Sequence, residues 1–248
     1  MPDSAASRRA ALVTGAARRI GAVIARRLHA AGFDVALHAR RSRAALDALV
    51  EDLERARASS TLALEADLGD VAVLADLVNA CVERFGRLDA LVNNAAAFYP
   101  TPIGSATPAQ WDELLGTNAR APFFLAQAAA PHLAAANGAI VNIVDIYAEQ
   151  PLAAHAVYSM SKAALAAMTK ALARDLAPHV RVNGVAPGAI LWPDSGKSDA
   201  AQQAVIERTP LRRTGSPDDI AGAVLWLLDA EFVTGEIVRV DGGRHLAM

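Results

Sequence analysis

The chain has 248 residues, and 24 Lys and Arg residues against 26 Asp and Glu residues give it a formal net charge of −2. Apolar residues make up 53% of the sequence and charged residues 20%, which is typical of a globular protein and excludes a disordered chain. The charge balance argues against nucleic acid as a partner, because proteins that bind nucleic acid usually carry a basic surplus on one face.

The N-terminus and the cysteine content indicate where the protein resides. Ser7-Arg8-Arg9 faintly resembles a twin-arginine export signal, but the apolar stretch after it soon meets Thr14-Gly15, where a signal would continue apolar. A single cysteine, Cys81, excludes an internal disulfide framework and favours a reducing compartment. No apolar run approaches the ~18 residues of a membrane span. We therefore predict a cytoplasmic protein without a membrane partner.

Short apolar runs alternate with amphipathic helical stretches along the whole chain. The predicted strands are Ala10–Val13, Asp34–Ala39, Thr61–Glu65, Ala90–Val92, Ala139–Val144, Val180–Val185 and Ile237–Val240. Strands that alternate with helices form βαβ units and hence a parallel sheet. No Pro-, Gly- and Ser-rich linker interrupts this alternation. The pattern predicts one α/β domain over residues 1–248: a Rossmann-type, doubly wound parallel sheet of about seven strands with helices on both faces.

The ends of several helices carry recognisable signals. Thr107-Pro108 followed by Gln110 predicts an N-cap, a proline at the first helical position and a capping box. Ser216-Pro217 followed by Asp219 predicts a second helix start of the same kind. Gly86 stands where a helix should stop, because glycine adopts the left-handed conformation that ends many helices.

A small-residue turn follows the first strand directly. Residues 14–21 read TGAARRIG, and such a turn places backbone N–H groups and the helix dipole against a pyrophosphate. Gly15 permits the tight turn, and Gly21 allows the helix to pack close to the strand. The stretch is not the G-x-G-x-x-G fingerprint, so an ordinary tight turn is the alternative. We predict that Gly15, Arg19, Ile20 and Gly21 contact a dinucleotide.

The end of the second strand indicates which dinucleotide is bound. A carboxylate at this position binds the ribose hydroxyls of NAD, whereas arginine accommodates the 2′-phosphate of NADP. The sequence has Arg40, Arg41 and Ser42 here, which offer two charged forks and a hydroxyl, and Arg19 is a further candidate for the phosphate. A solvated cluster of arginines at a helix start is the alternative. The absence of an acid favours NADPH.

Polar residues also follow the third and fourth predicted strands. Asp67, followed by Leu68, offers a carboxylate that can accept a hydrogen bond from the adenine amino group. Asn94 and Ala95 follow the fourth strand at the carboxyl edge of the sheet, where α/β proteins bind ligands. Asparagines also form turns without any binding role.

A tyrosine and a lysine share one face of the predicted helix 155–177. Tyr158 and Lys162 are four residues apart, and a lysine cation beside a phenol lowers the pKa of the phenol, so that it can exchange protons near neutrality. Asp145 stands at the end of the fifth strand, where it should lie within reach of Tyr158 and where its negative charge would oppose the effect of Lys162 on the pKa of Tyr158. Asn118 is expected at the start of the long helix 118–136. A surface pair is the alternative for Tyr158 and Lys162.

Together, these motifs resemble those of the short-chain dehydrogenase/reductase family over nearly the whole chain. The matching stretches are TGAARRIG at 14–21, DL at 67–68, NNA at 93–95, Asn118, YSMSK at 158–162, VRVNGVAPG ending in Pro187-Gly188, and VTGEIVRVDGG at 233–243. The resemblance implies that Tyr158 is the general acid and that Lys162 holds the nicotinamide ribose while tuning Tyr158. It further implies that Asn118 supports a water-mediated proton path, that Pro187 and Gly188 contact the cofactor, and that the protein is a homotetramer.

Two departures from the family pattern are similar to its pteridine reductase branch. Arg19 stands where most members have glycine, and Asp145 stands where most have serine. In that branch a pterin stacks between the nicotinamide and a phenylalanine, which corresponds to Phe98, and the aspartate joins the tyrosine in binding and protonating the ring. A flat ring gains from stacking on Phe98. An anionic Asp145 would repel the alkoxide that forms from a ketone, unless Asp145 were protonated.

The stretch after Gly188 departs from the family again. We expect residues 188–205 to form a mobile flap over the substrate. Leu191 and Trp192 either line the substrate pocket or, for Trp192, pin the flap to the body of the protein. The six histidines show no spacing typical of metal ligands, so no metal is expected.

The sequence therefore predicts NADPH-dependent reduction of a pterin, with dihydrofolate as a possible additional substrate. The residues expected to bind the pterin are Phe98, Asp145, Tyr158, Leu191 and Trp192. One alternative is an NADPH-dependent carbonyl reductase, such as a 3-oxoacyl thioester reductase, although its expected serine is missing. The other alternative is a non-catalytic NADP-binding regulator, which would have no reason to keep Tyr158 and Lys162.

Overall fold

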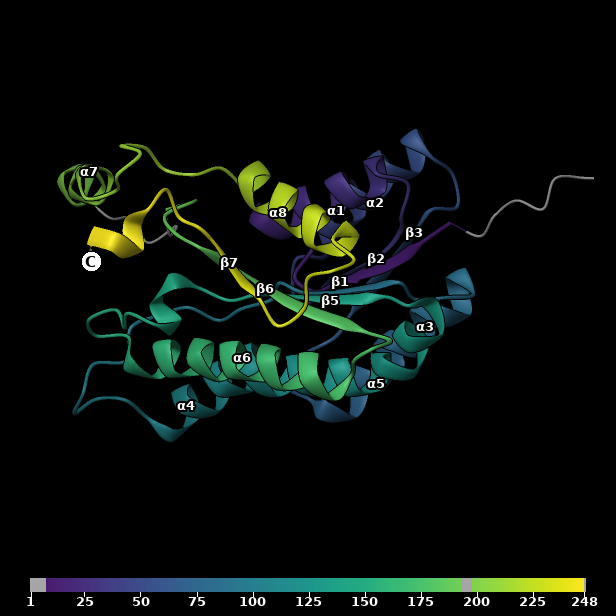
Figure 1. Ribbon diagram of the computed structural model, residues 1–248, viewed down its shortest axis with the longest axis horizontal. Helices are drawn as coiled ribbons and strands as arrows, with labels where there is room; N and C mark the ends of the chain where they lie inside the picture. Colours follow the sequence, from purple (N-terminus) through teal and green to yellow (C-terminus); the bar gives the residue numbers. More distant parts are fainter. Residues whose placement is uncertain (1–7, 193–197, 248) are drawn as a thin grey trace, which may run out of the picture.

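The computed structural model describes residues 8–192 and 198–247. In this part of the chain, seven strands form one parallel sheet in the order β3-β2-β1-β4-β5-β6-β7 (Figure 1). The strands are β1 (Ala10–Val13), β2 (Asp34–Ala39), β3 (Thr61–Glu65), β4 (Ala90–Asn93), β5 (Ala139–Ile143), β6 (Arg181–Pro187) and β7 (Ile237–Val240). The predicted parallel α/β sheet is confirmed, and the ends of three strands shift by one or two residues. The strand order reverses at β1, between β2 and β4, where such sheets bind ligands.

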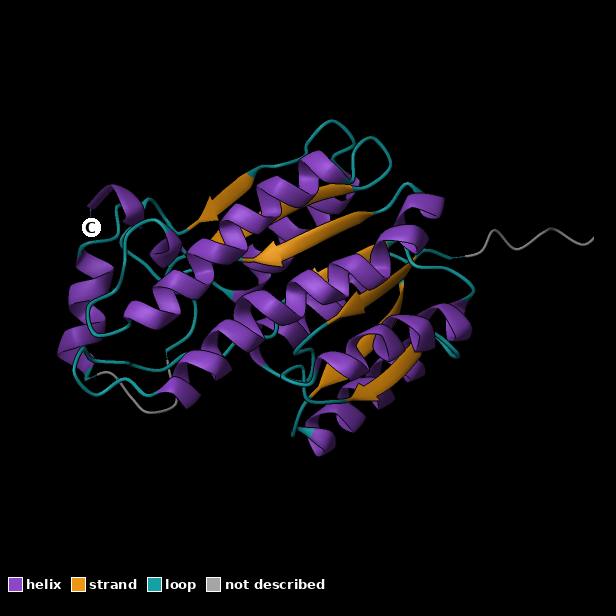
Figure 2. Ribbon diagram, turned by 90° about the horizontal axis from the view of Figure 1, so that it is seen from below, coloured by secondary structure: helices purple, strands orange, loops and turns teal. Residues whose placement is uncertain are grey.

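Helices cover both faces of the sheet. One face carries α1 (Arg19–Ala30), α2 (Arg43–Ala56) and α8 (Pro217–Asp229), and the other carries α3 (Leu74–Phe85), α4 (Pro108–Leu115), α5 (Ala121–Ala136) and α6 (Ala156–Asp175) (Figure 1). Figure 2 shows the strand arrows pointing the same way beneath these helices. A further helix, α7 (Asp199–Glu207), lies beyond the carboxyl end of β6, close to the C-terminal residues.

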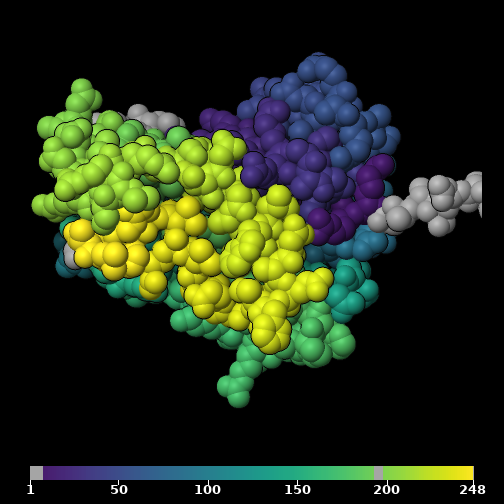
Figure 3. Space-filling view, turned by 45° about the horizontal axis from the view of Figure 1, so that its top comes forward, coloured from purple at the N-terminus to yellow at the C-terminus, as the bar shows by residue number. Residues whose placement is uncertain are grey.

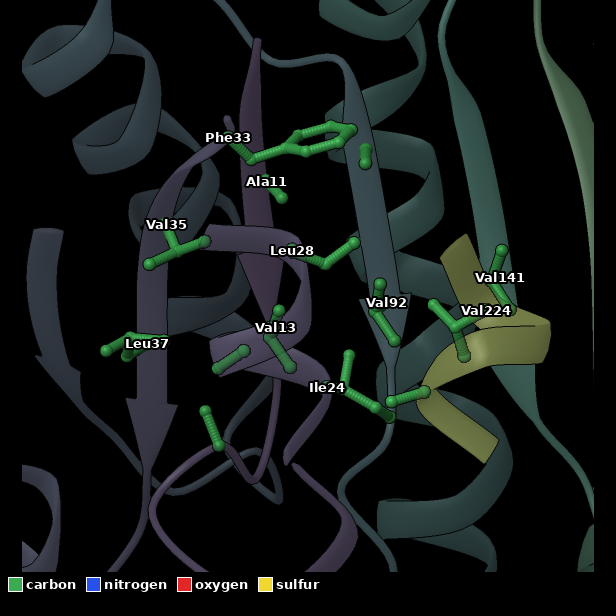
Figure 4. Packing of buried hydrophobic residues seen from close by; sticks show 14 of the residues in the cluster. Ala11, Val13, Ile24, Leu28, Phe33, Val35, Leu37, Val92, Val141 and Val224 are labelled. Carbon is green, nitrogen blue, oxygen red and sulfur yellow. The ribbon is translucent and has the colours of Figure 1, made fainter. Parts of the chain in front are cut away.

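Alternate residues of the central strand pack into two separate cores. Ala11 and Val13 of β1 face the cluster that contains Ile24 of α1 and Val224 of α8 (Figure 4). Leu12 faces the opposite cluster, built largely from α3 and α5. A strand buried on both faces is apolar without alternation, which explains the continuous apolar runs in the sequence.

The predicted helix signals are confirmed in the structure. The Thr107 side chain accepts a hydrogen bond from the N–H of Gln110, and the Gln110 side chain accepts one from the N–H of Thr107. Ser216 and Asp219 form the same reciprocal pair at the start of α8. Gly86 ends α3 in the left-handed conformation with a φ of +77°.

The prediction that Asn118 starts a helix is wrong. Residues 108–136 are helical throughout, and Asn118 lies in a π-helical turn, Gly116–Arg120, between α4 and α5. Pro122 has no N–H to donate to the carbonyl of Asn118, so the α-helical hydrogen bond cannot form at this point. The chain widens instead, and the N–H of Ala121 donates to the carbonyl of Gly116 five residues earlier.

The C-terminal residues pack against the chain around α7. Figure 3 shows the last residues, in yellow, lying against the green segment that contains α7. Arg244 donates from Nη1 to the carbonyl of Val205 at 3.1 Å, and the N–H of Leu211 donates to the carbonyl of Gly242 at 3.1 Å. These contacts connect the end of the chain to the segment that follows β6.

Candidate functional site

A cavity of about 540 Å³ opens at the carboxyl edge of the sheet, where the strand order reverses. Its walls come from the segments that follow β1, β2, β3 and β4, together with α4. The lining residues are Gly15, Ala17, Arg18, Arg19, Ile20, Gly21, His38, Arg40, Ser42, Asp67, Leu68, Asn94, Ala95, Ala96, Ala97, Tyr99, Glu113 and Thr117. Most residues expected to bind a dinucleotide therefore share one cavity.

The turn after β1 depends on two glycines and one asparagine. Gly15 has a φ of +64°, and a Cβ at Gly21 would lie only 2.1 Å from the carbonyl oxygen of Gly15. Asn94 donates from Nδ2 to the carbonyls of Thr14, at 2.8 Å, and Gly15, at 3.1 Å. Asn94 therefore braces the turn from β4, which is a more specific role than that of an ordinary turn former.

The N-terminus of α1 suits an anion. No side chain caps this end of the helix, and no acidic residue stands in its first turn. The backbone N–H groups and the positive end of the helix dipole therefore face the cavity without a carboxylate to compete with a phosphate. This arrangement fits the pyrophosphate of a dinucleotide.

Arg19 occupies a position that favours glycine. Its φ is +54°, in the left-handed region, which agrees with the glycine that most relatives are expected to have there. Its Nη2 donates to the carbonyl of Trp192 at 3.0 Å. Arg19 thus connects the first turn to the segment after β6.

His38 is a functional residue that the sequence analysis missed. It is buried at the end of β2, where its Nδ1 accepts a hydrogen bond from the N–H of Gly15 at 3.3 Å. Its Nε2 lies 3.1 Å from the carbonyl oxygen of Ala66. Burial lowers the pKa of His38, which keeps the ring neutral with its proton on Nε2. The available signal was a histidine within the apolar run that follows Asp34 in β2.

The arginines after β2 do not all reach the cavity. Arg40 and Ser42 line it, but Arg41 is exposed and does not, so the prediction that Arg41 joins this site is not supported by its position. Nη1 of Arg40 lies 3.9 Å from Oδ1 of Asp67 and 3.7 Å from Oε1 of Glu113. Asp67 also accepts a hydrogen bond from the N–H of Gly69.

A second cluster forms where β5 meets α6. The hydroxyl of Tyr158 donates to Oδ2 of Asp145 at 2.6 Å, so the predicted proximity of these two residues is confirmed. Asp145 caps the short helical turn Ile146–Ala148, where its Oδ1 accepts from the N–H of Tyr147 at 2.9 Å. The backbone thus fixes one carboxylate oxygen, and the other faces Tyr158.

Burial is the main cause of the shifted pKa values of Asp145, Tyr158 and Lys162. It raises the pKa of Asp145, and it raises the pKa of Tyr158 well above its ordinary value, with the charge of Asp145 adding to the effect. The raising effects of burial and of Asp145 therefore outweigh any lowering of the Tyr158 pKa by Lys162. Lys162 is buried, its Nζ donates to the carbonyl of Ile143 at 2.8 Å, and burial lowers its own pKa to about 8.

Asn118 holds a loop against α6. Its Oδ1 accepts from the N–H of Ala97 at 2.9 Å, and its Nδ2 donates to the carbonyl of Ala97 at 3.0 Å and to Oγ of Ser161 at 2.9 Å. These three hydrogen bonds fix the side chain of Asn118, and its part in a water-mediated proton path stays a prediction.

Phe98 lies beside Tyr158, as the sequence predicts. The two ring centroids are 4.7 Å apart in an edge-to-face arrangement, and the ring of Phe98 is 42% exposed. The imidazole of His155 stacks on Phe98 at 5.0 Å with an interplanar angle of 17°. His155 is thus a second residue that the sequence analysis missed at this site, because only the fold places it against the loop that carries Phe98.

The segment after β6 only partly matches its prediction. Gly188 passes close to the chain after β7, since a Cβ there would lie 2.7 Å from Cα of Asp241. Leu191 is 40% exposed. The residues that line the cavity do not include Pro187, Gly188, Leu191 or Trp192. The hydrogen bond from Arg19 reaches the backbone carbonyl of Trp192, so it connects this segment to the first turn without assigning a role to the indole ring. Within the expected flap, residues 193–197 lie outside the described residues, and α7 begins at residue 199.

The described residues contain neither a membrane-spanning helix nor a metal-binding cluster. None of the helices there has the length and apolar character that a membrane span requires. No group of three or more His, Cys, Asp and Glu side chains in residues 8–192 and 198–247 is placed to hold a metal ion.

Comparisons with known proteins show close relatives. A family described as Enoyl-(Acyl carrier protein) reductase matches residues 15–245. A putative ketoacyl reductase of granaticin polyketide synthase, from Streptomyces violaceoruber, is 41% identical and covers 95% of this chain and 96% of its own. Pteridine reductase 1 from Leishmania tarentolae is 36% identical, and the match covers 95% of this chain and 96% of the relative. A 3-oxoacyl-(acyl-carrier-protein) reductase from Staphylococcus aureus is 33% identical, and the match covers 96% of this chain and 98% of the relative.

Proposed function

Because the chain belongs to the short-chain dehydrogenase/reductase family, whose members are oxidoreductases that use a nicotinamide cofactor, we propose that it uses NADPH to reduce a pterin. The observation that carries this proposal is the 2.6 Å hydrogen bond between Tyr158 and Asp145. A pterin presents ring nitrogens and amide groups, which a carboxyl group can bind and protonate. In its anionic form the same carboxyl group would repel the alkoxide that forms from a ketone, whereas the protonated form would not.

The proton for the reaction would come from the hydroxyl oxygen of Tyr158. When bound, the reduced nicotinamide would supply the hydride. The hydroxyl of Tyr158 holds its proton because burial and the charge of Asp145 raise the pKa of the phenol. A protonated Asp145, whose own pKa is raised, can return a proton to Tyr158 across their hydrogen bond. Lys162, fixed on the carbonyl of Ile143, supplies positive charge beside Asp145.

The cavity supports a phosphorylated dinucleotide as the cofactor. The uncapped N-terminus of α1 and the braced turn at Gly15 offer backbone N–H groups for a pyrophosphate. Arg40 and Ser42 stand after β2, where an enzyme specific for NAD has an acid. These residues are the basis for preferring NADPH to NADH.

A side-by-side assay tests the proposal. NADPH oxidation is followed by its absorbance with dihydrobiopterin, dihydromonapterin, dihydrofolate and an acetoacetyl thioester at equal concentrations. We expect the dihydropterins to be reduced fastest, with dihydrofolate as a weaker substrate. Faster reduction of the thioester than of any pterin would contradict the proposal.

A carbonyl reductase is the second candidate. It is favoured by the 41% identity to the putative ketoacyl reductase, which exceeds the 36% identity to the pteridine reductase. The acid at position 145 counts against it. A non-catalytic regulator receives no support from the site, because Tyr158 and Lys162 are both present and buried beside Asp145. The homotetramer implied by the family resemblance and the cytoplasmic location stay predictions.

Phe98 is proposed as the surface on which the pterin stacks. We expect Phe98→Ala to raise the KM for the pterin while the Kd for NADPH stays nearly unchanged, because the ring lies beside Tyr158 and outside the cofactor cavity. Stacking contributes about 0.5–1.5 kcal/mol beyond area burial, so KM should rise about two- to tenfold. Steady-state kinetics and a melting curve check this. A lower Tm with unchanged kinetics would identify Phe98 as a loop anchor only.

A further inference from the structure

Beside Arg40, the cavity contains a carboxylate to which the proposed function gives no role. Glu113 on α4 lines the cavity, and its Oε1 lies 3.7 Å from Nη1 of Arg40. Asp67 approaches the same nitrogen from the end of β3, at 3.9 Å. The arginine proposed to bind a cofactor phosphate is therefore flanked by two acidic side chains.

A hydrogen bond from Tyr99 orients the Glu113 carboxylate. The hydroxyl of Tyr99 donates to Oε2 of Glu113 at 2.9 Å and lies 3.2 Å from the carbonyl oxygen of Gln110. The hydrogen bond to Glu113 and its charge add to burial in raising the pKa of Tyr99 to about 12. One oxygen of Glu113 is thus occupied by Tyr99, and the other faces Arg40.

We propose that Glu113 is a specificity-determining residue: it competes with the 2′-phosphate of the cofactor for Arg40 and so weakens the preference for NADPH over NADH. This inference rests on the proposed use of NADPH. It assigns to α4, on the opposite side of the cavity from β2, a direct part in the choice of cofactor.

A role in orienting Arg40 would have the opposite effect, and two observations argue against it. The Nη1–Oε1 distance of 3.7 Å exceeds a hydrogen-bond length, and the side chains of Arg40 and Glu113 are 39% and 44% exposed. Such exposed ion pairs contribute little to orienting a side chain. A phosphate carries nearly two negative charges, so its repulsion by a carboxylate in the same cavity outweighs that contribution.

Binding of two small probes tests the proposal without any turnover. The ligand 2′,5′-ADP carries the 2′-phosphate, and 5′-AMP lacks it. By calorimetry, we expect Glu113→Gln to bind 2′,5′-ADP about three- to tenfold more tightly than the wild type, with little change for 5′-AMP. The gain should shrink at high salt, because salt screens repulsion between partly exposed charges.

Two further variants separate this effect from a general change of charge. Asp112→Asn removes a neighbouring acid on α4 that does not line the cavity, and should leave both affinities unchanged. Tyr99→Phe removes the hydroxyl that holds Glu113, so it should give a smaller gain for 2′,5′-ADP. In the double variant, Tyr99→Phe should add nothing to the gain that Glu113→Gln gives alone. Tyr99→Phe also provides the test if Glu113→Gln fails to fold.

The outcomes distinguish this inference from the proposed cofactor. A wild type that prefers 2′,5′-ADP, with the same preference in Glu113→Gln, overturns the role of Glu113 and leaves NADPH in place. A weaker preference in Glu113→Gln would show that Glu113 positions Arg40 instead of competing for it, and also overturns the proposal. No preference in either protein overturns the assignment of NADPH together with the role of Glu113.

Discussion

Asp145→Asn should reduce pterin turnover by about 10²-fold or more, while NADPH binding and folding are retained. The amide keeps the oxygen that accepts from the N–H of Tyr147, so the cap of the turn after β5 survives. It removes the group that returns a proton to Tyr158 across the 2.6 Å hydrogen bond. Steady-state turnover and the melting temperature, measured on the same preparation, check this result.

The pH dependence follows from the raised pKa of Asp145. Only the protonated acid can supply a proton, so turnover should fall as the pH rises through this raised pKa. Tyr158 stays protonated across this range because its own pKa is raised further. Tyr158 and Asp145 are joined by a hydrogen bond, and Lys162 lies close to both. The apparent pKa seen in the pH profile therefore belongs to the cluster of three groups and not to Asp145 alone. In Asp145→Asn this descending limb should disappear.

Lys162 provides an independent readout of the same substitution. The charge of Asp145 raises the pKa of Lys162 against the larger lowering effect of burial, and the outcome is about 8. Without that charge the pKa of Lys162 should fall further.

Undiminished pterin turnover in Asp145→Asn, with an unchanged pH profile, would show that Asp145 is not the proton source.

Asp145→Ser tests the choice between a pterin and a carbonyl substrate. It restores the residue that most members of the family are expected to have at this position. We expect pterin turnover to be lost, because the proton donor is gone, and weak ketone reduction to appear, because no ionised form of residue 145 remains to repel an alkoxide. The Asp145→Asn protein is the matched comparison, since it also lacks the charge but keeps the size of the side chain.

Arg40→Ala/Arg41→Ala should weaken the binding of NADPH by about tenfold or more and leave NADH nearly unaffected. Only NADPH offers a 2′-phosphate, and a hydrogen bond to a charged group contributes roughly 1.5–3 kcal/mol. Titration of each cofactor by its fluorescence gives the two Kd values. In the single variants, Arg40→Ala should account for most of the loss, because Arg40 lines the cavity and Arg41 does not.

Arg43→Ala is the control for the loss of a positive charge near this site. Arg43 is exposed on α2 and pairs with Asp47 outside the cavity, so its loss should change neither Kd. Equal weakening of NADPH and NADH in the double variant would contradict the assignment of the arginines to the 2′-phosphate.

The sequence alone determined the local features of this protein, such as its strands and the ends of its helices. The apolar runs of the strands, the capping boxes at Thr107 and Ser216 and the left-handed glycine at position 86 act over a few residues, and each is found where it was expected. The four-residue spacing of Tyr158 and Lys162 likewise placed them on one helix. These features depend on backbone geometry and neighbouring side chains, which the sequence displays directly.

Only the tertiary structure decided how residues far apart in the chain act on one another. The sequence predicted that Lys162 lowers the pKa of Tyr158 and that the charge of Asp145 opposes this effect. The fold buries Tyr158 and Lys162, and desolvation becomes the largest cause that raises the pKa of Tyr158. The hydrogen bond from Gly15 to His38 and the approach of Glu113 to Arg40 exist only because the sheet and α4 bring these residues to one cavity. Burial and through-space charge depend on packing between distant segments, and these interactions therefore have no local signature in the sequence.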